Sequence, residues 1–491
     1  MQSKIRSLAS DTIIYGVSTV VGRFLTFFLT PLYTNYLTAG EIGDVSAIYT
    51  MIAFVNVVYS LGMEPAFMRF WDKENPQNNN RVFAISAAAV GLIGIVVTLC
   101  TVLFAQYIAD SPTLSLGSEG GRLVAVASIV PLLDALVLIP FAKLRIEQRP
   151  KRFALLRLAS IVVTVACNMM FVVLFDMRST GVFISAILGS MVTLVLTLPM
   201  YRGVWGTLTS ATSESKKLFT EMLRFGLPTV PSSFSSIMVQ VADRPIMLML
   251  VGNAAVGMYQ TNFRLALPMM MMVTVFEYAW RPFYLNHRTD PQAKVLFSRV
   301  LTLFTAVCGF VFLVTAFFMP YIVQLPFIGG RFINPAYWSG LVIVPVVMFA
   351  YYFNGVFINL TAGFHIEKRT SFFPIATVAA AVVSIGGTWL LVPEYGIMGA
   401  AWAKVAAYVC SVGVLAVVLP RVYSIRYDLV RVGATLAFAG VAFAVVNIVQ
   451  VQGAWDVVLR CSALLLYVLL LFIFRILGTA PLRTVLSMVK R

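Results

Sequence analysis

The sequence predicts an all-α polytopic membrane protein with about fourteen transmembrane helices. Apolar residues make up 60% of its 491 residues, charged residues only 11%, and the mean hydropathy is +0.89. A soluble protein carries roughly 25% charged residues. Apolar stretches recur along the whole chain, and each is long enough to cross ~30 Å of hydrocarbon. Lysine and arginine are also distributed very unevenly between the connecting segments.

The apolar stretches give the expected helices in order. The seventh and eighth are the least regular, because Pro228, Pro231, Pro245 and Pro268 interrupt them. We expect helices at about 11–34, 42–63, 82–108, 122–141, 153–176, 180–201, 225–251, 254–285, 297–320, 335–360, 370–392, 396–420, 429–450 and 457–477.

The basic residues predict the orientation. The net charge is +16, but alternate connecting segments hold 25 of the 36 lysines and arginines, whereas the segments between them hold only Arg122, Arg178 and Arg331. Because cytoplasmic loops are enriched in lysine and arginine, both termini are predicted to be cytoplasmic. The positive charge is thus explained by topology, and nucleic acid is not an expected partner.

The sequence gives no indication of disulfide, metal or catalytic sites. All five cysteines fall within apolar spans without a CxxC pair, so neither a disulfide framework nor a metal site is expected. The sequence suggests no catalytic residues and no cofactor, and the protein is not expected to be an enzyme. The first span carries Arg23 and no small-residue cleavage site, so we expect it to be retained.

The chain contains an apparent internal repeat with an offset of 213 to 220 residues. Four pairs of short segments recur in order: 42–45 with 256–259, 64–67 with 277–280, 146–149 with 366–369, and 181–186 with 396–401. The repeat spans six helices, an even number, so both copies have the same orientation in the membrane. This predicts two six-helix bundles related by an axis along the membrane normal, with a cavity between them.

The repeat also predicts the domain boundaries. We expect an N-terminal bundle of helices 1–6 at 1–215 and a C-terminal bundle of helices 7–12 at 216–425. Helices 13 and 14, with a cytoplasmic tail, occupy 426–491. These two helices lie outside the repeat and could pack on the outside, or hold a lipid tail or a partner.

Four cationic residues lie deep within predicted spans: Arg23, Arg244, Arg264 and Lys404. A charge at the bilayer centre costs at least ~2.5–3.5 kcal/mol, so such residues face a bundle interior or a water-filled cavity. Arginine suits phosphate, because its planar fork donates two parallel hydrogen bonds. These residues are candidates for binding an anionic substrate. The alternative is a structural ion pair with an embedded acid.

Polar neighbours extend this candidate site. Gln260 lies one turn before Arg264, and Asn56 lies deep in the second helix. Asp134, Asp243 and Glu277 are candidates for coupling transport to an ion, although neutralising a nearby arginine is an equally good interpretation. Arg157, Arg224, Arg281 and Arg460 lie near span ends, where we expect them to extend into the lipid headgroups.

Several segments resemble a known family, the polysaccharide or lipid-linked oligosaccharide flippases. These Wzx-like proteins belong to the multidrug/oligosaccharidyl-lipid/polysaccharide (MOP) exporter superfamily. The likeness lies in Ser10 to Gly16, in Pro31 to Thr34, in Gly40 to Gly43 and in Glu64 to Trp71. Helix number and repeat extend it over the whole chain. Related lipid II flippases have a denser basic cluster in their first helix, which makes lipid II itself less favoured here.

The resemblance implies a flippase of a bacterial cytoplasmic (inner) membrane. It implies that a polyprenyl-diphosphate-linked oligosaccharide moves from the inner to the outer leaflet by alternating access. The expected partners are this glycan, membrane lipids and, further, polysaccharide polymerase or assembly proteins.

Two alternatives remain. A multidrug exporter of the same fold would move organic cations and use embedded acids, whereas the deep charges here are mostly basic. A membrane-embedded glycan polymerase or ligase would need catalytic groups in a large outer loop. The longest outer loops, about 109–121 and 321–334, hold no histidine and few ionisable residues.

Overall fold

The computed structural model describes residues 20–72, 75–117, 119–202, 212–369, 371–449, 451, 453–474 and 476. Within these ranges, eleven helical stretches are long and apolar enough to cross a membrane. Two of them are broken, at Gly252 (φ 80°) and at Gly396 (φ 54°). The breaks separate predicted helices 7 from 8 and 11 from 12, and α15 (Leu267–Asn286) completes helix 8. With the first helix, described from residue 20, the chain has the fourteen-helix, all-α polytopic fold that the sequence predicts.

The chain folds into two compact units. Unit 1 comprises Met1–Thr261, Phe327–Trp338 and Ala381–Ala403, and unit 2 comprises the rest. These units do not follow the boundary at 215/216, and the predicted division into two six-helix bundles stays a prediction.

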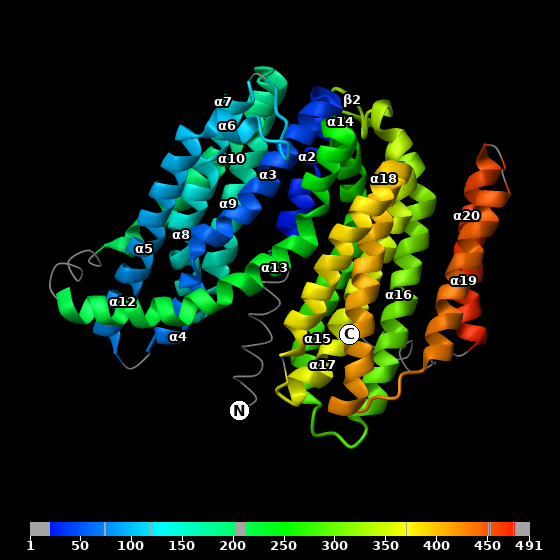
Figure 1. Cartoon of the computed structure of the whole chain (residues 1–491). Helices are drawn as coiled ribbons and strands as arrows, with labels where there is room; N and C mark the ends of the chain where they lie inside the picture. The colour runs from blue at the N-terminus through cyan, green and yellow to red at the C-terminus, as the bar shows by residue number, and fades with distance from the viewer. Residues whose placement is uncertain are drawn as a thin grey trace. The chain divides into compact units, whose positions relative to one another are not determined.

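Unit 1 contains most of the helices drawn from blue to green in Figure 1. A helix over residues 20–27 comes first. It is followed by α2 (Leu29–Tyr36), α3 (Ala39–Ser60), α4 (Met63–Phe70), α5 (Pro76–Leu103), α6 (Ala105–Ala109), α7 (Gly120–Ala127), α8 (Ile129–Ile146), α9 (Pro150–Asn168), the π-helix η1 (Met169–Leu174), α10 (Arg178–Thr197), η2 (Leu198–Tyr201), α12 (Thr212–Gly226), η3 (Leu227–Thr229), α13 (Val230–Val241) and α14 (Asp243–Leu265), whose last four residues lie in unit 2.

The later elements are α15, α16 (Ala293–Ile322), the two short strands β1 (Pro326–Phe327) and β2 (Gly330–Arg331), η4 (Pro335–Ile343), α17 (Val344–Ile366), α18 (Phe372–Val422), α19 (Leu429–Ile448) and α20 (Ala454–Ile473). In unit 2, α19 and α20 pack on α16 around Leu313, Phe317 and Tyr467. The Tyr467 hydroxyl donates to the Ala306 carbonyl at 3.0 Å, and Gly309 leaves room for this phenol. Helices 13 and 14 therefore dock against helix 9.

The segment before helix 7 differs from the expected loop. Residues 212–226 form α12, with Leu218, Phe219 and Met222 packed on the core cluster of α4, α5 and α8. Charged residues on the other face lower its mean hydropathy, so a hydropathy window does not detect it. The helix ends where Pro228 leads into η3.

Two loops of the predicted repeat share one backbone turn. Gln148 and Lys368 have φ values of 53° and 56°. The amide of Arg149 donates to the Leu144 carbonyl at 2.9 Å, and that of Arg369 donates to the Phe364 carbonyl at 2.8 Å. A left-handed residue with this six-residue hydrogen bond is a Schellman ending of a helix. The same helix ending therefore closes both copies of the segment.

The first turn of α3 crosses α14 within unit 1. A Cβ on Gly43 would collide with the Asn253 carbonyl, and a Cβ on Gly257 would collide with the Ala39 carbonyl. Gly257 follows Gly43 by 214 residues, and Asn253 follows Ala39 by the same number. Each half of the contact is thus the counterpart of the other, as at a two-fold interface. Only glycine lets the two backbones approach this closely.

The segment that carries β1 and β2 lies against residues 27–37. The Asn35 side chain donates to the Arg331 carbonyl at 2.6 Å, and the Tyr337 hydroxyl donates to the Leu37 carbonyl at 3.0 Å. The ring centroids of Phe27 and Phe332 are 6.0 Å apart. These contacts hold residues 327–338 beside α2 and the loop that precedes α3.

Candidate functional site

A polar cavity of about 380 Å³ lies inside unit 1, between α3, α8, α9 and α10. Its wall includes Asn56 and Asp134, two of the residues that the sequence singles out. Aromatic side chains complete the wall, namely Tyr59, Phe141 and Phe153. Pockets of this size that combine apolar walls with a few polar groups are typical ligand sites.

Two acids and two arginines line this cavity. Glu64 and Arg145 form an ion pair. The Asp134 carboxylate accepts a hydrogen bond from the Ser190 hydroxyl at 2.7 Å and is otherwise exposed to the cavity. The Arg157 guanidinium lies 5.6 Å from the centroid of the Phe141 ring. The formal charges balance, and the cavity presents both hydrogen-bond donors and acceptors.

The cavity is lined by three charged residues that the sequence did not propose for a site. Arg157 lines the cavity and contacts an aromatic face, whereas the sequence suggested that it extends into the headgroups. Glu64 and Arg145 were not among the predicted site residues. The signal for Glu64 is its recurrence at Glu277 in the repeat. Arg145 could not be identified this way, because its pairing with Glu64 joins helices 81 residues apart in sequence.

Arg460 makes contacts that the sequence did not predict. Its side chain is only 18% exposed, and it donates to the Asp456 carboxylate at 2.9 Å and to the Phe317 carbonyl at 2.6 Å. The guanidinium also lies over the Tyr321 ring. These contacts tie α20 to α16, and the headgroup position of Arg460 stays a prediction.

Three predicted site residues lie on α14 in unit 1. Asp243 is 1% exposed and accepts a hydrogen bond from the Tyr259 hydroxyl at 2.8 Å. Arg244 and Gln260 are partly buried. The Nε of Arg244 and the Oε1 of Gln260 are buried without a hydrogen-bond partner among the described residues. Buried polar atoms normally find such a partner, so these two atoms are exceptions, although both are closed off from solvent in this structure.

Arg23 lies in the helix over residues 20–27 and is partly buried. Its neighbour Thr26 donates to the Gly22 and Arg23 carbonyls at 3.1 and 2.9 Å. The Thr26 hydroxyl therefore donates its hydrogen bonds within its own helix, as serine and threonine hydroxyls often do in membrane helices.

The remaining predicted residues belong to unit 2. Lys404 is 2% exposed, and Arg264 is partly buried. Glu277 is exposed and pairs with Arg281, one turn further on, at 3.9 Å. This pairing makes Glu277 the weakest of the three ion-coupling candidates.

No group of three His, Cys, Asp or Glu residues within the described ranges is arranged to hold a metal ion. The cysteines are free. Both histidines lie at helix ends, with Nδ1 2.9 Å from a carbonyl oxygen of their own helix.

The fold is that of flippases and transporters. The structure described as "Lipid II flippase MurJ, inward closed conformation" matches with a TM-score of 0.76, 15% identity, and coverage of 94% of this chain and 98% of that chain. An inward-facing multidrug resistance MATE family transporter of the MOP superfamily matches with a TM-score of 0.63, 14% identity, and coverage of 84% and 98%. The outward-facing conformation of such a transporter matches with a TM-score of 0.55 and 14% identity, over 86% and 97%.

The class is thus a multi-pass membrane protein with the MOP superfamily fold. A model of the family "Polysaccharide biosynthesis protein" matches residues 8–283, more than half of the chain. The chain belongs to this family, which confirms the resemblance to Wzx-like proteins drawn from the sequence. The comparison with curated proteins gives no match.

Proposed function

We propose that the protein is a flippase for a polyprenyl-diphosphate-linked oligosaccharide. It moves this polysaccharide repeat unit from the inner to the outer leaflet of a bacterial cytoplasmic membrane, with both of its own termini in the cytoplasm. The observation that carries the proposal is the family match over residues 8–283, joined to a fold shared with a lipid II flippase. The named relatives transport rather than catalyse, which argues against a polymerase or ligase.

The embedded cations are the residues that we propose for binding the diphosphate. Arg23, Arg264, Arg244 and Lys404 all lie within helices of predicted spans, and Lys404 is almost fully buried. A diphosphate offers several oxygens to guanidinium forks. The glycan would occupy the hydrated interior, with Asn56 and Gln260 as polar contacts, while the prenyl tail stays in lipid.

Alternating access fits the crossing of α3 and α14. The paired contacts of Gly43 and Gly257 have the two-fold character expected where two copies of a repeat meet. A side-chain hydrogen bond from Asn253 to the Asp44 carboxylate also joins the two helices, so opening of the crossing must break this bond as well as separate the backbones. We propose that this crossing closes the outer side and opens to release the substrate.

The driving force follows from the substrate charge. With a negative cytoplasm, outward movement of an anion is downhill by about 2.3 kcal/mol per charge per 100 mV. Asp134, Asp243 and Glu277 are the proposed ion-coupling residues, with Asp134 favoured because its carboxylate is open to a cavity. If the flipping rate in sealed vesicles responds neither to an imposed potential nor to an imposed pH gradient, the proposed driving force is excluded.

The decisive experiment measures flipping of a labelled polyprenyl-diphosphate oligosaccharide in proteoliposomes. Arg264→Glu and Arg23→Glu are compared with wild type after normal insertion and folding have been verified. Arg299→Glu is the matched control, because Arg299 is exposed and lies outside the proposed site. Losing a buried, hydrogen-bonded charge partner costs about 2–5 kcal/mol, so both site variants should lose more than tenfold in rate.

Equal flipping by wild type and both site variants would assign these arginines to structure. If wild type itself fails to flip the glycan, the second candidate is a multidrug exporter of the same fold. It is favoured by the likeness to MATE transporters and by the acidic side chains in the unit 1 cavity. Uptake of an organic cation by the same proteoliposomes would then establish the multidrug exporter function.

A further inference from the structure

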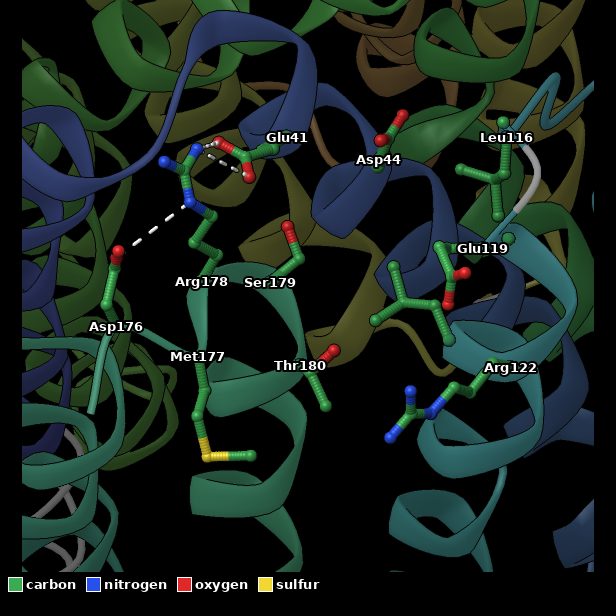
Figure 2. A pocket seen from close by; sticks show the side chains of 13 residues that line it. Glu41, Asp44, Leu116, Glu119, Arg122, Asp176, Met177, Arg178, Ser179 and Thr180 are labelled. Atoms are coloured by element: carbon green, nitrogen blue, oxygen red, sulfur yellow. Dashed lines mark hydrogen bonds and ion pairs between the residues drawn. The ribbon is translucent and has the colours of Figure 1, made fainter.

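A second pocket, of about 400 Å³, lies where the first turns of α3, α7 and α10 meet in unit 1 (Figure 2). We name it the end pocket and define it by Glu41, Asp44, Glu119, Arg122, Asp176, Arg178, Ser179 and Thr180. Three helix N-termini direct backbone N–H groups and positive dipole ends towards this region. The site proposed for transport uses none of these residues.

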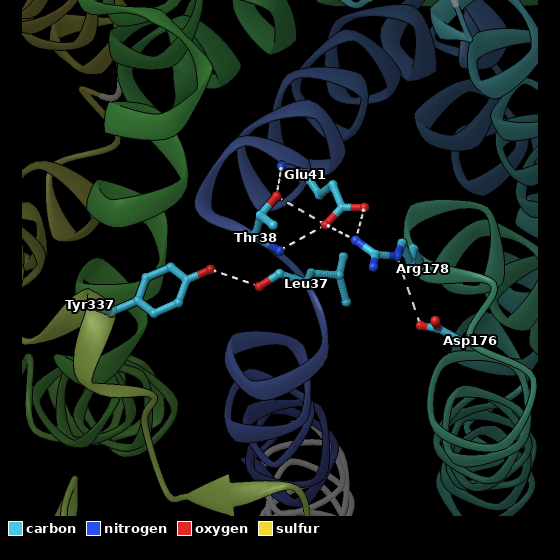
Figure 3. A network of polar contacts seen from close by, with 6 residues as sticks. All are labelled: Leu37, Thr38, Glu41, Asp176, Arg178 and Tyr337. Atoms are coloured by element: carbon cyan, nitrogen blue, oxygen red, sulfur yellow. Dashed lines mark hydrogen bonds and ion pairs between the residues drawn. The ribbon is translucent and has the colours of Figure 1, made fainter.

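One wall of the end pocket is held rigidly. The Glu41 carboxylate accepts from the Thr38 amide at 2.8 Å and from the Thr38 hydroxyl at 2.9 Å, which caps α3. The same carboxylate lies 3.4 Å from the Arg178 guanidinium, whose Nε is 3.8 Å from Asp176 (Figure 3). The loop carrying Thr38 is fixed in turn by Tyr337. This wall is preorganised and needs no ligand to form.

Of the other groups of the end pocket, Asp44 accepts a hydrogen bond from the Asn253 side chain, whereas Ser179, Glu119 and Arg122 have side chains with unused hydrogen-bonding capacity. Ser179 is 9% exposed, yet its hydroxyl is buried without a hydrogen-bond partner in the described part of the chain. Figure 2 shows this hydroxyl directed into the pocket, between Arg178 and Asp44. Glu119 and Arg122 are exposed on the opposite side, and neither side chain forms an ion pair or hydrogen bond with another described residue. A buried hydroxyl without a partner is rare and points to a missing ligand or water.

The mixture of charges selects the ligand chemistry. Four carboxylates outnumber the two arginines, which disfavours a simple anion, and the exposed Arg122 disfavours a cation beside it. No described cluster here has three ligands placed for a metal. A sugar is neutral, and each of its hydroxyls both donates and accepts. Sugar hydroxyls can therefore donate to Glu119 while accepting from Arg122 and from the Ser179 hydroxyl.

The connections at this end are the ones predicted to face outside. They are residues 37–38, 110–119 and 175–177. We infer that the end pocket binds a sugar residue of the glycan at the outer face, apart from the diphosphate site. The inference rests on the proposed function, because it takes the transported glycan as the source of the sugar.

The test uses the purified full-length protein in detergent and saturation-transfer NMR with four free sugars as probes. The probes are glucose, galactose, N-acetylglucosamine and rhamnose. Wild type should bind at least one of them. Ser179→Ala and Arg122→Gln should each weaken that binding about tenfold, the factor equivalent to about 1.4 kcal/mol.

Ser185→Ala is the matched control. Ser185 lies on the same helix as Ser179 but outside the pocket, and its hydroxyl donates to the Gly181 carbonyl within that helix. Its sugar binding should equal that of wild type. Arg122 is exposed, so Arg122→Gln should fold even if Ser179→Ala does not.

No binding of any probe by wild type, or binding that survives both pocket variants, would overturn the inference. Wild type that flips the lipid-linked glycan yet binds no sugar would refute the end pocket alone. Wild type that binds sugar through Ser179 but does not flip the glycan would refute the proposed function instead.

Discussion

Gly43→Ala tests whether the crossing of α3 and α14 is a gate. The added Cβ would lie 2.6 Å from the Asn253 carbonyl carbon and 3.0 Å from its Cα. Both are backbone atoms, so no side-chain rotation can relieve the overlap. Overpacking of this kind costs about 1–3 kcal/mol.

The cost applies only while the crossing is closed. If the crossing opens during transport, Gly43→Ala destabilises one conformation and leaves the other unchanged. A differential free energy of about 1–3 kcal/mol shifts the ratio of the two by roughly 5- to 150-fold. The ratio of the open to the closed conformation should therefore increase by that factor.

Spin labels at the start of α3 and just after the Gly252 break in α14 measure the ratio of the open to the closed conformation. We would label Gly40→Cys and Ala254→Cys after replacing the five native cysteines. Ala254 is exposed, and a Cβ on Gly40 has room. Pulsed dipolar spectroscopy should show a longer-distance population that grows in Gly43→Ala.

Gly440→Ala in α19 is the control, because a Cβ there meets nothing within 4 Å. Its distance distribution should match that of the parent. If folded Gly43→Ala also keeps the parent distribution, the crossing does not open and the gating argument is refuted.

Two further predictions concern single sites. Gly309→Ala should place a Cβ 3.0 Å from the Tyr467 ring carbon that carries the hydroxyl, break the bond to Ala306, and destabilise the protein by about 1–3 kcal/mol. A thermal midpoint in detergent equal to that of wild type would contradict this packing argument. Asp134→Asn keeps a group that can accept from Ser190 but removes the charge, so transport should lose its response to an imposed pH gradient. A response in sealed vesicles as strong as that of wild type would assign Asp134 to structure.

Much of the fold could be predicted because the bilayer imposes it locally. Each span must be about 20 apolar residues long, and each loop carries its own basic residues. The segments 146–149 and 366–369 likewise encode their own turn, which is why a match in sequence became a match in backbone conformation. The break at Gly252 falls between the predicted helices 225–251 and 254–285, so its position could be predicted from the sequence.

The candidate sites depended more on tertiary structure. The sequence indicated Asn56 and Asp134 separately, but only packing of α3, α8, α9 and α10 places them in one cavity with Arg157. The sequence shows that Arg460 lies near the end of a span, which predicts a position at the headgroups. It does not show the hydrogen bond from Arg460 to the Phe317 carbonyl, because that bond joins two distant helices.

The amino-acid sequence by itself determined the class of protein, the number and order of its helices, and the family. These depend on composition and on patterns within about 20 residues, because each helix must by itself be long and apolar enough to cross the bilayer and must satisfy its own backbone hydrogen bonds. Only the tertiary structure decided which helix faces meet, and hence the glycine crossing, the unit 1 cavity and the end pocket. Most faces of a membrane helix are apolar, so hydropathy cannot tell a face that contacts lipid from one that contacts protein.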